Sequence, residues 1–85
     1  MANNLIIRRF EVKPEFRRLS EVEVIGTVDI STPPFNSAPV FLKGDNGDEV
    51  VMVPGECHAF QRISLSDIWI RGDEGNIVTV IGGTW

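Results

Sequence analysis

The residues best suited to chemistry in this sequence are its one cysteine and its one histidine, which are neighbours. Cys57 could serve as a nucleophile and His58 as the base that activates it. The surrounding segment, however, reads as an extended strand, in which successive side chains point to opposite faces. The two groups should therefore diverge, and we predict no catalytic pair. A single cysteine also excludes an internal disulfide, which fits a reducing compartment or a particle assembled inside the cell.

Metal and nucleotide sites are not predicted either. A catalytic zinc or iron ion usually has three or more protein ligands, which one histidine does not supply. Carboxylates gather in two glycine-bearing segments, Gly44–Asp48 and Gly72–Asn76, but neither has the spacing of an EF-hand loop. Gly82-Gly83 is not followed by the helix or lysine of a phosphate-binding loop. We therefore expect no metal, no cofactor and no catalytic residue, and we interpret both segments as solvated turns.

Charge is divided unevenly along the chain. Residues 1–20 carry five basic and two acidic side chains, whereas residues 21–85 carry three basic and ten acidic ones. Nucleic-acid binding depends on Lys and Arg neutralising phosphates, so the acidic remainder argues against it. No apolar run approaches the roughly 20 residues of a membrane span, and the first residues lack a signal-peptide pattern. A basic segment on an acidic body better suits contacts between protein subunits.

Basic and aromatic side chains are the remaining candidates for binding. Trp69 lies between two isoleucines, so its indole should face outward if they face the core, and aromatic anchors are enriched at interfaces. Trp85 should dock either on its own sheet or on a partner. The predicted interface residues are Arg8, Arg9, Phe10, Arg17, Arg18, Phe35, Trp69 and Trp85.

The elements that position these residues all read as strands. Apolar residues alternate most clearly at Val22, Val24, Val28 and Ile30, and Ile6, Phe10 and Val12 share one side of an earlier strand. We predict strands at Leu5–Lys13, Val22–Ile30, Val40–Lys43, Glu49–Val53, Glu56–Ile63, Ser66–Arg71 and Ile77–Ile81. The fold class is therefore all-β, a small antiparallel β-sandwich or jelly-roll-like barrel.

The connections complete this prediction. Asn46-Gly47 suits a tight hairpin turn, and Gly72–Asn76 predicts a second hairpin. Ser31–Pro39, with three prolines, predicts a surface connection that presents or tucks in Phe35, and Glu15–Glu21 is expected to be irregular. Eighty-five residues make one domain, divided into a basic N-terminal strand and arm at 1–20 and a sandwich body at 21–85.

Residues 53–83 resemble the C-terminal hairpin of small tailed-bacteriophage virion proteins. The likeness lies in a Pro-Gly-Glu turn at Pro54–Glu56, the run Leu65-Ser66-Asp67-Ile68-Trp69, and a glycine-bearing turn followed by Ile77–Gly83. This resemblance implies a capsid decoration (cement) protein or similar virion component, often trimeric, bound at junctions between capsid subunits.

Our first hypothesis is therefore a non-enzymatic virion structural protein that forms a homo-oligomer, a trimer by the resemblance, and binds the major capsid protein or another virion protein. It would be found on the particle surface, and in the host cytoplasm during assembly. The alternatives are a carbohydrate-type ligand-binding module, in which Trp69 or Trp85 stacks on a sugar, and a tail-associated structural protein.

Overall fold

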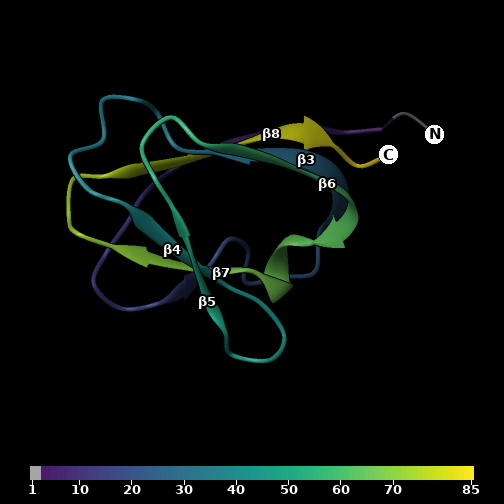
Figure 1. Ribbon diagram of the computed structural model, residues 1–85. Coiled ribbons are helices and arrows are strands. Elements are labelled where there is room, and N and C mark those ends of the chain that lie inside the picture. Colours follow the sequence, from purple (N-terminus) through teal and green to yellow (C-terminus); the bar gives the residue numbers. More distant parts are fainter. Residues whose placement is uncertain (1–2) are drawn as a thin grey trace.

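The fold is a sandwich of two four-stranded antiparallel sheets that are not closed into a barrel (Figure 1). The computed structural model describes residues 3–85. What we call the long sheet contains, in spatial order, β1 (Leu5–Glu11), β8 (Ile77–Gly83), β3 (Ile25–Ser31) and β6 (Cys57–Ser64). What we call the short sheet contains β2 (Arg17–Arg18), β7 (Trp69–Gly72), β4 (Val40–Lys43) and β5 (Glu49–Met52). A 3-10 turn, η1 (Leu65–Asp67), joins β6 to β7, and the predicted all-β sandwich is confirmed.

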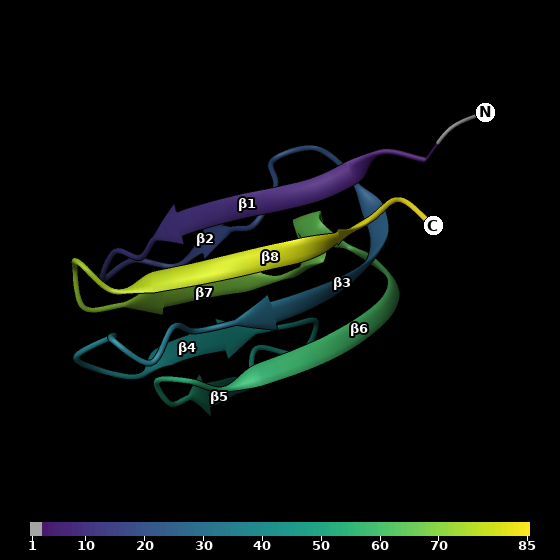
Figure 2. The same cartoon turned by 90° about the horizontal axis from the view of Figure 1, so that it is seen from above.

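The strand order is that of a jelly roll. Pairing is nested, so that β1 pairs with β8, β2 with β7, β3 with β6, and β4 with β5. Two further pairs, β3 with β8 and β4 with β7, complete the sheets. Figure 2 shows the long sheet lying in front of the short one, with the chain passing between the layers. Only the β4–β5 connection stays within one sheet.

One of the two predicted hairpins is present. Lys43 pairs with Glu49 across the Gly44–Asp48 turn, in which Gly47 has a φ of 85°. The predicted second hairpin is wrong, because β7 and β8 belong to different sheets. A glycine-bearing turn marks a reversal of the chain but does not specify whether the reversal stays in one layer. Here the Gly72 amide donates to the Lys13 carbonyl at 2.9 Å, which holds β7 against the N-terminal segment.

The core lies between the inner faces of the two sheets. Ile6, Phe10 and Val12 share the inner side of their segment as predicted, because Ile6 and Val12 are buried and Phe10 packs against the core. The predicted strand at Val22 is wrong at its start, because β3 begins at Ile25 and Val22 is 68 % exposed. The cause is local, since the Ser20 hydroxyl donates to the Val22 carbonyl at 2.7 Å and turns the chain there. The buried core residues are Ile6, Val12, Leu19, Val28, Ile30, Val40, Met52, Leu65, Ile70, Val78 and Val80.

The proline-bearing β3–β4 connection is anchored by a buried asparagine. The Asn36 side chain accepts a hydrogen bond from the Ile77 amide and donates one to the Ile77 carbonyl, both at 2.9 Å. These bonds continue the ladder beside β8 beyond the last β3–β8 pair, Ser31 with Thr79. The asparagine amide thus takes the place of a peptide unit at the point where β3 leaves the sheet.

Replacing this amide tests the anchor. Asn36→Ala leaves both backbone groups of Ile77 without partners in a buried site, which should lower the free energy of unfolding by about 2 kcal/mol. The measurement is urea unfolding followed by circular dichroism. Asn4→Ala is the control, because Asn4 is exposed and its side chain makes no hydrogen bond within residues 3–85; it should change stability by less than about 0.5 kcal/mol. Equal effects of the two substitutions would contradict the anchoring role.

Candidate interaction surfaces

The outer face of the short sheet carries alternating cations and aromatic rings. Because Ile70 and Leu42 pair with their side chains toward the core, Trp69, Arg71, Phe41 and Lys43 point outward. The contacts, measured from charged group to ring centroid, are Arg18–Trp69 at 4.8 Å, Lys43–Trp69 at 5.3 Å, Lys43–Phe16 at 4.3 Å, Arg71–Phe16 at 5.2 Å and Arg71–Phe41 at 4.6 Å. We call these six residues the cation–aromatic stack.

Only one of the three cations in the stack, Arg71, is paired with a carboxylate within residues 3–85. Arg71 donates to the Glu49 carboxylate from Nε at 3.2 Å and from a terminal nitrogen at 2.9 Å. Within residues 3–85, Arg18 and Lys43 have no carboxylate at ion-pair distance. Each cation–ring contact contributes about 0.5–1 kcal/mol at an exposed site. Two unpaired cations, Arg18 and Lys43, are therefore held beside aromatic rings on this face.

Sequence reasoning identified only part of the stack. Arg18 and Trp69 were predicted as interface residues, whereas Phe16, Phe41, Lys43 and Arg71 were missed. The sequence did contain a signal for the last three of these. Each of two strands carries an aromatic and a basic residue two positions apart, which therefore face the same way: Phe41 and Lys43 in one, Trp69 and Arg71 in the other. It becomes informative only once β4 is known to pair with β7, and these strands are far apart in the sequence.

A shallow polar hollow adjoins the stack at Trp69. Its volume is ≈ 400 Å³, within the range of about 300–1,000 Å³ that is usual for small-ligand sites. Its walls combine an aromatic ring, a guanidinium, a hydroxyl and two carboxylates, contributed by Arg18, Gly44, Asp45, Ser66, Asp67 and Trp69. Donors and acceptors therefore surround the same space as the indole.

The outer face of the long sheet carries exposed aliphatic side chains instead. Cross-strand register places Ile7 beside Ile81, and these are 65 % and 53 % exposed. The indole of Trp85 lies over Gly83, where a Cβ would fall only 1.7 Å from the ring. Trp85 therefore docks on its own sheet and remains half exposed. We call this surface the apolar patch; it consists of Leu5, Ile7, Ile25, Ile81 and Trp85.

The other predicted interface residues are scattered. The Arg8 guanidinium donates to the Leu19 carbonyl at 3.3 Å, and Arg17 lies over the Phe10 ring at 5.8 Å. These contacts connect β1 to the segment around β2 along one edge of the sandwich. Arg9 lies on the outer face of the long sheet, in register with Thr79, and Phe35 is 75 % exposed on the β3–β4 connection. The structure therefore does not bring the eight residues into one surface.

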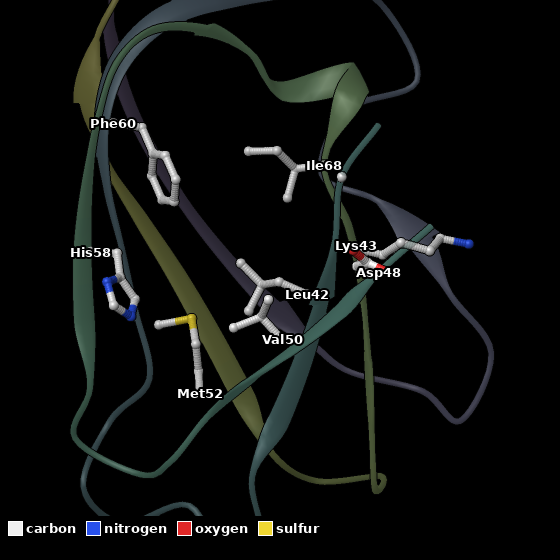
Figure 3. A pocket seen from close by; sticks show the side chains of 9 residues that line it. Leu42, Lys43, Asp48, Val50, Met52, His58, Phe60 and Ile68 are labelled. Carbon is white, nitrogen blue, oxygen red and sulfur yellow. The ribbon is translucent and has the colours of Figure 1, made fainter. Parts of the chain in front are cut away.

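The opposite edge of the sandwich, between β5 and β6, is open. Its cleft has a volume of ≈ 310 Å³. In Figure 3, His58 and Phe60 project from β6 toward Met52, Val50 and Leu42, while Lys43 and Asp48 lie at the far end. The cleft offers an apolar surface with one imidazole at its margin.

His58 is bonded to a nearby acid rather than to Cys57. Its Nε2 hydrogen-bonds a carboxylate oxygen of Glu56, while Cys57, its neighbour in β6, is exposed. This bond from His58, followed by a bond from the Val53 amide, holds the pKa of Glu56 below its ordinary value of 4.5. Within residues 3–85, no group of three or more His, Cys, Asp or Glu side chains is placed to hold a metal ion.

This pair gives a pH-dependent prediction. A lowered pKa in the folded state means that the contribution of Glu56 to stability is present above pH 4.5 and is lost as the pH falls through the lowered value. His58→Ala removes the largest cause, so the Glu56 pKa should rise toward 4.5 and stability should depend less on pH in the acidic range. Carbon-13 NMR of the Glu56 carboxyl measures the midpoint. The same midpoint in both proteins would contradict the assignment.

Comparison of the chain with protein-family models, curated proteins and solved structures found no match. Within the described residues, no helix is long and apolar enough to cross a membrane.

Proposed function

We propose that this chain is a non-enzymatic structural component of a virus particle, a decoration protein that binds capsid subunits. The cation–aromatic stack carries the proposal. Trp, Tyr and Arg dominate the binding energy of protein interfaces, and the stack presents Trp69 between two cations, Arg18 and Lys43, that lack carboxylate partners in the described residues. A complementary partner surface is acidic, because it would supply those missing carboxylates.

The architecture supports the same proposal. Jelly-roll sandwiches are common among viral capsid domains, although lectins and other binding proteins also use them. A protein that bridges subunits needs two adhesive surfaces, and here the stack and the apolar patch lie on the outer faces of opposite sheets. The sequence resemblance of residues 53–83 to small phage virion proteins implies such a role for head and tail components alike, although β7 and β8 do not form the hairpin of those proteins.

Cosedimentation with particles tests the proposal. The protein should copurify through a density gradient with particles of the virus that encodes it, in a fixed number of copies, and should dissociate as salt screens the exposed charges. Removing both unpaired cations with Arg18→Gln and Lys43→Gln should weaken binding about tenfold or more. Arg62→Gln removes an exposed cation outside the stack and should leave binding unchanged. Absence of the wild-type protein from purified particles would refute the proposal.

Saccharide binding is a second candidate, which the polar hollow beside Trp69 favours. An indole next to a guanidinium and two carboxylates can contact both the apolar face and the hydroxyl groups of a sugar. Such a neutral ligand would not require the acidic partner that the first candidate does.

Fluorescence titration tests this second candidate. In a Trp85→Phe background only Trp69 reports, and a panel of neutral mono- and oligosaccharides should produce a saturable change in its emission. Asp67→Asn should weaken the response, because it replaces an acceptor carboxylate at the hollow. A panel without any saturable change would remove saccharide binding from consideration.

A further inference from the structure

The apolar patch gathers five exposed apolar side chains on the outer face of the long sheet. Leu5 is 67 % exposed, Ile7 65 %, Ile81 53 %, Trp85 50 % and Ile25 42 %. They lie on β1, β3 and β8 and on the residues that follow β8, so they occupy one continuous face. Contiguous exposed apolar surface of this kind marks an interaction site.

Arg9 and Asp29, which have opposite charges, lie on this face, and the third charged residue there, Glu11, is paired with Lys13. Arg9 on β1 pairs in register with Thr79 on β8, and Asp29 on β3 pairs in register with Ile81, which is also on β8. Arg9 therefore lies one strand to one side of β8, and Asp29 lies one strand to the other side. Neither has a partner at ion-pair distance within residues 3–85. The midpoint between the two side chains falls on β8, between Thr79 and Ile81.

We propose that the apolar patch binds a second copy of this chain through a two-fold axis passing close to that midpoint. In a two-fold interface, each contact from residue i to residue j is repeated from j to i. An axis that lies in the interface at this position, perpendicular to the line from Arg9 to Asp29, places Arg9 of each copy opposite Asp29 of the other and brings the aliphatic side chains around Ile81 together. The face is thus self-complementary in charge and apolar at its centre.

This inference rests on the proposed function and deepens it by naming what covers the face opposite the stack. It also differs from the trimer that the resemblance implies, because one two-fold interface closes a dimer. The stack remains free on the outer side of each copy for contact with a capsid subunit. A dimer of this kind would present two stacks facing in opposite directions.

The test is the mass of the purified full chain in solution, by light scattering over a range of concentrations. Arg9→Glu and Asp29→Arg should each raise the dimer dissociation constant about tenfold, because each sets two pairs of like charges against one another. The double variant restores opposite charges across the interface and should return the constant to within about threefold of wild type.

Apolar contact is tested separately. Ile81→Lys should abolish the dimer, whereas Val51→Lys places the same charge on the outer face of the short sheet and should leave it intact. Both positions are exposed, so both variants should fold, and circular dichroism verifies this.

A monomer at every concentration, a trimer, or a dimer indifferent to Ile81→Lys and to the charge reversals would each overturn the inference. Because these measurements need no particle, the dimer can fail while particle binding holds, and particle binding can fail while the dimer holds. The double variant Arg18→Gln with Lys43→Gln should weaken particle binding and leave the dimer dissociation constant unchanged.

Discussion

The position of β8 is the constraint on which the rest of the molecule depends. This strand pairs with β1 on one side and with β3 on the other, so it joins the two ends of the chain into one sheet. The close approach to β3 requires a residue without a side chain, because a Cβ on Gly82 would lie 2.1 Å from the Thr27 carbonyl oxygen. Gly83 leaves space for the Trp85 ring in the same way. Gly82 therefore allows β3 to approach β8, and Gly83 allows the Trp85 ring to lie on the outer face of the sheet.

The two outer faces follow from this arrangement but differ in chemistry. The long sheet has strands of seven or eight residues and exposes aliphatic side chains. The short sheet has strands of two to four residues, and its outer face depends on cation–ring contacts between strands. Phe16 precedes β2 yet reaches both Lys43 and Arg71, so the stack also ties three separate segments of the chain together.

Much of the fold could be predicted from local patterns, because strand alternation and the Asn46-Gly47 turn are properties of short segments. The pairing could not, since Gly72–Asn76 has the composition of a hairpin turn but passes between layers. Asn36 was not identified for a related reason, because its importance comes from Ile77, 41 residues away. The candidate surfaces were predicted only in part: Arg18 and Trp69 were identified individually, but the face they form exists only once β2, β7 and β4 are aligned.

The nested order of the strands also affects how the chain reaches its native state. Loop closure favours contacts that are close in sequence, so the β4–β5 hairpin can form early, whereas Leu5 must wait for Gly83, 78 residues further on. Until then β1 is an unpaired strand with apolar residues at its start, the kind of segment from which chains aggregate. Arg8 and Arg9 interrupt that apolar run, and charged residues in such positions protect nascent strands. The basic character of the first strand therefore has a use before the sandwich exists, as protection for the part of the protein that folds last.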